Sequence, residues 1–222
     1  DDKVFDTLNY KSSGSYRKYN TNIDELDVIN DLIFTSNDNF NLIKNSSSDF
    51  IFLLRNINTY GDLSNTYKDD ESYSLLSSVL YNFKYPLFKK TKENKKFLTP
   101  VASFRYSPNP GLNFKNEKTL ITYDDLFKLD RISNKTVEEG VSTTIGLEYK
   151  NQNANDKDKI NLKLAVNFRA KENEDLPLSS SLNQKTSDII GYSGINISEN
   201  LSLNYNFSIE QNLSGTNYSL IS

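Results

Sequence analysis

Polar and apolar residues alternate with a period of two along most of this chain. The clearest run covers residues 201–209, whose odd positions are all apolar or aromatic: Leu201, Leu203, Tyr205, Phe207 and Ile209. Residues 160–169 and 141–150 repeat the alternation without the i, i+3, i+4 spacing of a helix. Because successive side chains of a strand point to opposite faces, this pattern predicts long β-strands with one apolar face.

Less regular alternation predicts seven further strands, which brings the total to about ten. They lie at residues 8–19, 26–34, 50–58, 73–85, 98–106, 189–197 and 217–221. Pro100 interrupts one of them. Because proline has no N–H to donate to a sheet, we expect a bulge or a strand start at this position. The predicted fold class is all-β and antiparallel.

Several of the predicted strands have ten or more residues, and this length separates two kinds of β-protein. Strands of soluble proteins usually have about five or six residues, whereas a tilted membrane-spanning strand needs about nine to eleven. The face opposite the apolar one carries Lys, Arg, Glu and Asn, as in a barrel with lipid outside and water inside. We therefore predict an antiparallel transmembrane β-barrel segment, about ten strands of a larger barrel. A soluble β-sandwich also alternates, so alternation alone leaves that fold open.

Three connections between the predicted strands are long: residues 60–72, 107–137 and 170–186. Counting strands puts all three on one rim, which we assign to the outside because outer-membrane barrels carry their long loops there. Residues 36–48 and 86–95, on the other rim, are long for minimal turns. The chain starts at Asp1 without an initiator Met, and its last residues read as a strand. We expect residues 1–222 to be part of one outer-membrane barrel domain.

Composition argues against several classes of function. The net charge of -3 and the pI near 5.2 do not suit a nucleic-acid partner, which would need a concentrated basic face. The sequence contains no His and no Cys, so the commonest general base and thiolate metal ligands are absent. We predict no enzyme activity, no cofactor and no catalytic or metal-binding residues. No apolar run reaches eighteen residues, so we expect no membrane-spanning helix.

Two kinds of charged cluster have a plain and a functional interpretation. Acidic clusters occur at 69–71, 124–125 and 138–139, where solvated charge is the default and divalent-cation binding the alternative. The basic run 89–96 is interpreted as a solvated turn, with contact to anionic lipid or a partner as the alternative.

The long connection 107–137 contains an unusual block, LFKLDRIS, at residues 126–133. We expect its apolar residues to fold the loop onto the barrel rim: Leu126, Phe127, Leu129 and Ile132. We expect Asp130 and Arg131 to form a local ion pair, which at an exposed position would contribute only about 0–1 kcal/mol.

The order of motifs around this block resembles the C-terminal barrel of the LptD family, the outer-membrane LPS-assembly proteins. A strand with an aromatic-rich, Pro-containing end (FLTPVASFRYSPNPG) precedes the loop, and a strand with a GLxY-type ending (EEGVSTTIGLEY) follows it. Five residues match the family's [LF]-x-x-[LY]-D-R-[IL] loop core: Leu126, Leu129, Asp130, Arg131 and Ile132. The specific resemblance covers about a quarter of the chain.

The resemblance implies a function without covalent chemistry. A very large closed barrel in the cell outer membrane would receive lipopolysaccharide from an LptA-like periplasmic bridge. It would deliver the lipopolysaccharide to the outer leaflet through a lateral opening, with an LptE-like lipoprotein as a plug inside the barrel. This chain would be a fragment that lacks the family's N-terminal periplasmic domain, its terminal gate strands and its disulfide cysteines.

The barrel interpretation assigns a side to individual residues. Outward residues such as Leu162, Val166, Leu203 and Phe207 would contact outer-membrane lipid. Four polar residues would face the lumen or the plug: Glu148, Lys163, Arg169 and Asn204. Two alternatives remain, an outer-membrane porin or substrate-specific channel, and a soluble secreted β-sandwich or adhesin module.

Overall fold

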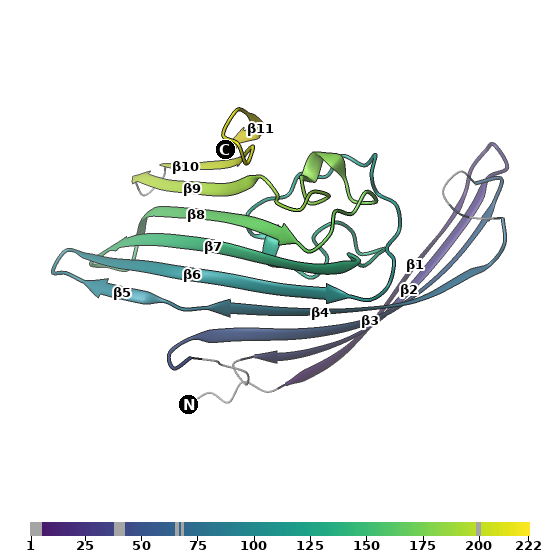
Figure 1. Ribbon diagram of the computed structural model, residues 1–222, viewed down its shortest axis with the longest axis horizontal. Helices are drawn as coiled ribbons and strands as arrows, with labels where there is room; N and C mark the ends of the chain where they lie inside the picture. The colour runs from purple at the N-terminus through teal and green to yellow at the C-terminus, as the bar shows by residue number, and fades with distance from the viewer. Residues whose placement is uncertain (1–5, 38–42, 65–66, 68, 199–200) are drawn as a thin grey trace.

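A computed structural model describes residues 6–37, 43–64, 67, 69–198 and 201–222. Eleven strands form one antiparallel sheet in the order β1-β2-β3-β4-β6-β7-β8-β9-β10-β11, and β5 pairs with β6 beside this path (Figure 1). The strands are β1 (Thr7–Lys18), β2 (Asp24–Asn37), β3 (Ser47–Asp62), β4 (Ser72–Lys84), β5 (Leu87–Lys90), β6 (Asn94–Ser107), β7 (Gly140–Asn153), β8 (Asp158–Arg169), β9 (Ile189–Ser198), β10 (Leu201–Ile209) and β11 (Thr216–Ile221). Two 3-10 turns, η1 (Asp125–Phe127) and η2 (Leu178–Ser180), lie in the long connections.

The all-β antiparallel fold and the ten predicted strands are confirmed. The eleventh, β5, falls within residues 86–95, which the sequence pattern treated as a connection. The expectation for Pro100 was wrong, because Pro100 lies inside β6 and pairs with Leu147 of β7 in an unbroken register. The pairing of β6 is interrupted on its other side instead, where the chain passes from β4 to β5. On that side β6 pairs with β5 up to Leu98 and with β4 from Val101 onward.

The outer face of the sheet is unlike the surface of a soluble protein, and the inner face combines buried apolar residues with buried polar and charged ones. The outer face is apolar yet exposed: Ile145 keeps 56% and Leu164 46% of its surface accessible. The inner face carries polar residues that are fully buried, such as Arg55 and Asn167, both at 0%. Soluble proteins bury apolar side chains and leave charged ones in water. Nine of the strands have 9–16 residues, which also exceeds the usual length in soluble sheets.

Two long connections cover part of the inner face. Residues 108–139 join β6 to β7, and residues 170–188 join β8 to β9 (Figure 1). Strands β3, β6 and β8 run in the same direction, so the three predicted long connections leave one end of the sheet, as expected. Of the connection between β3 and β4, residues 65, 66 and 68 lie outside the described part of the chain.

The buried apolar residues gather between the inner face and these connections. One cluster combines sheet residues with residues of both connections: Val101, Ala165, Ile190, Ile121, Tyr123, Leu126, Leu176 and Leu182. A second cluster joins Val137 to residues of β2, β3 and β4. The described strands leave the sheet open, with β1 and β11 at its two edges. Among the described residues, no helix has the length and apolar character needed to cross a membrane.

Candidate functional site

Arg55 connects the sheet to the connection 108–139. Its guanidinium group donates five hydrogen bonds from the inner face of β3. Nε and Nη2 bond to the Asp31 carboxylate of β2 at 2.7 and 2.8 Å, and Nη1 and Nη2 bond to Asp130 at 3.1 and 2.9 Å. The fifth bond goes from Nη1 to the Thr136 carbonyl at 2.8 Å. All donors of this buried arginine are therefore satisfied, as burial of a charge requires.

Glu138 is the second point of connection, with three arginines around it. Arg131 donates from Nε to Oε2 at 2.6 Å and from Nη2 to Oε1 at 2.5 Å. Arg169 of β8 donates to Oε1, and Arg105 of β6 places its Nε 3.9 Å from Oε2. Arg131 also donates from Nη1 to Asn167 of β8 at 3.0 Å. One loop carboxylate therefore binds guanidinium groups from two separate strands and from its own loop.

The charges around Glu138 control its ionisation. Burial on its own would raise the pKa of this carboxyl group, because it disfavours the charged form. The positive charges of Arg131, Arg105 and Arg169 outweigh burial and lower the pKa to about 2. Glu138 is therefore ionised at any physiological pH, and the connection stays electrostatically attached to the sheet.

The block 126–133 lies deeper than expected. Leu126 is fully buried in the cluster with Val101 and Ala165, which belong to the inner face of β6 and β8. The block therefore packs against the wall of the sheet, and not only on its rim. The expected ion pair within the block is also wrong: Asp130 binds Arg55 and Arg131 binds Glu138.

The connection reaches across nearly the whole inner face. Near one edge of the sheet, Lys135 places its Nζ 3.5 Å from Asp27 of β2. Near the other edge, Tyr218 of β11 donates its hydroxyl to the Ile121 carbonyl at 2.5 Å. A single segment of the chain thus contacts strands that are far apart in the sheet.

The four residues predicted to face the lumen all lie on the inner face. Arg169 belongs to the Glu138 cluster. Glu148 accepts a hydrogen bond from Tyr123 at 3.1 Å, and Lys163 forms an ion pair with Asp124 at 2.8 Å. Asn204 lies apart from these three and accepts a hydrogen bond from the Tyr192 hydroxyl at 2.7 Å.

Sequence reasoning missed three central residues, Arg55, Arg105 and Glu138. Both arginines occupy inward positions in predicted strands. The alternation of faces along these strands could therefore have identified them as inward-facing. Glu138 was interpreted as one of the solvated acidic clusters, and this was wrong because its side chain is buried. Its neighbour Glu139 is exposed, so only one of the two adjacent carboxylates has the structural role.

Comparison with known proteins gives one result for most of the chain. Residues 39–220 match the family model LptD, described as LPS transport system D. No curated protein matches the chain.

Proposed function

The chain belongs to the LptD family, and from this premise we propose that its sheet is a section of the barrel wall and lumen through which lipopolysaccharide is inserted into the outer leaflet. The family transports and assembles lipopolysaccharide at the outer membrane, and it is not a family of enzymes. The proposal assigns the exposed apolar face to lipid and the polar face to the lumen. Residues 1–222 would form part of one barrel domain.

The observation that carries the proposal is the exposed apolar outer face of the sheet, which lies opposite an inner face with several buried charged residues. A soluble β-sandwich would bury its apolar face against a second sheet, whereas Ile145 and Leu164 are exposed here. A contiguous exposed apolar surface of this kind fits contact with hydrocarbon. Arginines, carboxylates and amides on the opposite face fit a wet interior.

The connections 108–139 and 170–188 would partition the lumen near one end of the wall. If the long connections face outward, as in other outer-membrane barrels, this closed end is the extracellular one. The buried ion pairs of Arg55 and Glu138 support a partition that remains closed, since breaking a buried pair costs about 3–5 kcal/mol. Cargo would then leave sideways through the wall, not along the barrel axis.

Membership of the LptD family supports partners from the same lipopolysaccharide transport system. An LptA-like bridge would supply lipopolysaccharide from the periplasmic end, and an LptE-like lipoprotein would occupy the lumen. The inner-face residues away from the two connections, among them Asn204, are available to such a plug. The proposed chemistry is passive binding and passage.

Two lysine substitutions on opposite faces test the wall assignment. In the full-length protein, Val166→Lys places a charge on the outer face, and we expect it to destabilise the folded barrel by about 2–4 kcal/mol if the site is near mid-membrane. Asn204→Lys places the same charge on the inner face, where water is available. The amount of heat-modifiable, folded barrel in outer-membrane fractions measures both effects.

Cellular lipopolysaccharide gives the functional readout. In cells depleted of their native copy, the wild-type protein should restore surface lipopolysaccharide, Asn204→Lys should restore it nearly as well, and Val166→Lys should fail. Equal tolerance of the two lysines would refute the assignment of the faces. Failure of the wild-type protein to restore surface lipopolysaccharide would refute the proposed transport role itself.

A further inference from the structure

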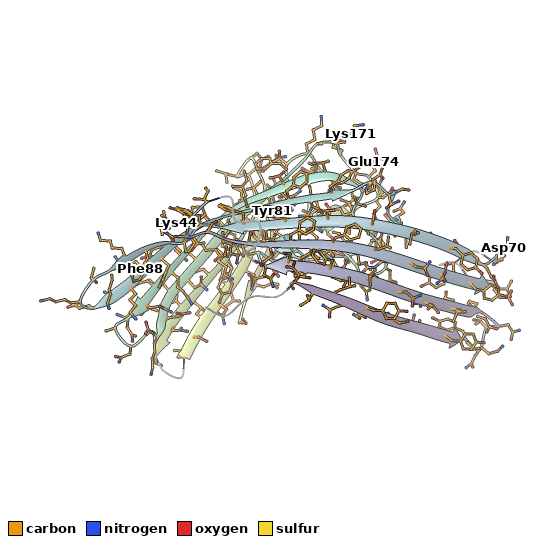
Figure 2. All side chains as sticks on the ribbon, turned by 90° about the horizontal axis from the view of Figure 1, so that it is seen from below. Lys44, Asp70, Tyr81, Phe88, Lys171 and Glu174 are labelled. Carbon is orange, nitrogen blue, oxygen red and sulfur yellow. The ribbon has the colours of Figure 1, made fainter. Side chains whose placement is uncertain are left out.

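The β5–β6 hairpin carries a local charge opposite to that of the chain. Residues 84–96 contain six lysines and one glutamate, whereas the whole chain has 26 basic and 29 acidic residues. Phe88 in this hairpin lies at the end of the sheet away from Lys171 and Glu174 of the connection 170–188 (Figure 2). The basic hairpin is therefore at the end opposite to the one that the long connections cover.

The register divides the lysines of the hairpin between the two faces. Lys90 pairs with Lys95, and Lys89 pairs with Lys96. Lys95 has the same parity in β6 as Val101, which is buried on the inner face. Lys90 and Lys95 therefore lie on the inner side, and Lys89 and Lys96 on the outer side.

Apolar rings accompany the inner lysines. Phe88 pairs with Phe97, their ring centroids lie 5.0 Å apart, and Phe88 keeps 55% of its surface exposed. Lys150 of β7 lies directly opposite Phe97 in the register. This part of the inner face thus combines exposed aromatic surface with ammonium groups, which suits an amphipathic ligand with negative charge.

Two of these lysines form ion pairs with carboxylates of the β7–β8 region, and both pairs are partly exposed to solvent. Lys95 pairs with Asp156, a well-exposed residue of the β7–β8 turn, and Lys150 with Asp158 at 3.0 Å. Solvent screens partly exposed pairs of this kind, and fully exposed ones contribute only about 0–1 kcal/mol, so an anionic group can compete for the lysines. A hollow of about 730 Å³ at the β7–β8 turn continues the polar surface toward β9 and β10, and Lys157 and Lys159 line it.

We propose that the inner side of the β5–β6 hairpin, with Lys90, Lys95, Lys150 and the Phe88–Phe97 pair, binds the phosphate groups of lipopolysaccharide as it enters the barrel. This inference rests on the proposed transport function and names the part of the cargo that the site recognises. A phosphorylated glycolipid offers dianionic groups for the lysines and apolar surface for the two rings. The outward pair, Lys89 and Lys96, faces the membrane and takes no part in cargo binding.

The register supplies a matched test within one hairpin. A photo-crosslinking phenylalanine analogue replaces Phe88 in the full-length protein in cells, and the lipopolysaccharide adduct is measured by immunoblot. Lys90→Gln with Lys95→Gln should lower the adduct about fivefold to tenfold, as expected for two exposed charge contacts. Lys89→Gln with Lys96→Gln removes the same charge from the outer side and should change the adduct less than about twofold.

Two further arms identify the recognised group. Lys90→Arg with Lys95→Arg should restore the adduct, because the charge is kept, and heat-modifiable migration verifies that each variant is folded. With purified wild-type protein, lipopolysaccharide from which the phosphates have been removed should give the low adduct level of the Lys90 and Lys95 double variant.

Three outcomes would overturn the inference while leaving the transport function intact. They are equal adducts for the two glutamine double variants, equal adducts with dephosphorylated lipopolysaccharide, and an adduct at the mass of a protein partner in place of lipopolysaccharide. Restoration of surface lipopolysaccharide by the wild-type protein, measured in the same cells, tests the transport function separately.

Discussion

Glu138→Gln should release the connection 108–139 from the inner face. Lowering the pKa of Glu138 from 4.5 to about 2 corresponds to roughly 3 kcal/mol of preferential stabilisation of the ionised form in the folded protein. Glutamine keeps the shape of the side chain but removes the negative charge that Arg131 and Arg169 share. Its amide donors would also face guanidinium groups. The loss of one partner from a buried ion pair costs about 3–5 kcal/mol, which agrees with the figure from the pKa.

Limited trypsin digestion of the full-length protein at neutral pH measures this release. The connection contains potential cleavage sites after Arg131, which is buried, and Lys135, which is half-buried, and both become more accessible when the segment lifts from the sheet. When opening is fast relative to cleavage, the cleavage rate follows the population of the open form. A loss of about 3 kcal/mol should therefore raise the rate by about two orders of magnitude.

The neighbouring carboxylate provides the control. Glu139 is exposed, and Arg169 contacts its backbone carbonyl and not its side chain, so Glu139→Gln should leave the cleavage rate unchanged. A Glu138→Gln protein that is cleaved no faster than about twice the wild-type rate would refute the assigned role of the carboxylate.

Two further predictions concern the same connection. Because the folded-state pKa of Glu138 is depressed, the stability it contributes is fully present above about pH 4.5 and is lost as the pH falls toward 2. Cleavage by an acid-active protease should thus accelerate over this range in the wild type, and much less in Glu138→Gln. Leu126→Ala should destabilise the closed connection by about 2–5 kcal/mol, because the residue is fully buried. Leu120→Ala, at an exposed site of the same connection, should change the opening free energy by less than about 0.5 kcal/mol.

The strands could be predicted from the sequence because the alternation that defines them is local. Within β10 the polarity of each residue indicates which face it lies on, and the predicted bounds Leu201–Ile209 are those of the structure. The short strand β5 was not predicted, because two of its four residues are lysines and it therefore has no apolar face of its own. Its position depends on pairing with β6, which is information that another part of the chain carries.

The arrangement around the connection 108–139 could be predicted only in part. The apolar residues of the block indicated that it folds against the barrel, but the depth of that packing depends on space between Val101 and Ala165 of separate strands. The ion pairs join residues far apart in the sequence, such as Arg55 and Asp130. A local ion pair between Asp130 and Arg131 was the simplest interpretation of adjacent charges, and long-range contacts replaced it.

The adjacency of Asp130 and Arg131 has a physical explanation that can be tested by exchanging them. The two side chains point to different strands. Asp130 forms an ion pair with Arg55 of β3. Arg131 bonds to Asn167 of β8 and to Glu138 of its own connection. Asp130→Arg combined with Arg131→Asp keeps the composition but places an arginine against Arg55 and an aspartate against Glu138. Both attachments would then become repulsive.

We expect the exchanged protein to be cleaved within residues 108–139 at least as fast as Glu138→Gln. The control is the exchange Glu117→Lys with Lys118→Glu, because these neighbours of opposite charge are both exposed in the same connection. If the cleavage rate depended only on the local order of charges, the two exchanges would change it by the same amount. A much larger effect at 130 and 131 would mean that this dipeptide links two distant strands, β3 and β8. The order of its two charges would then be determined by the partner that each residue meets.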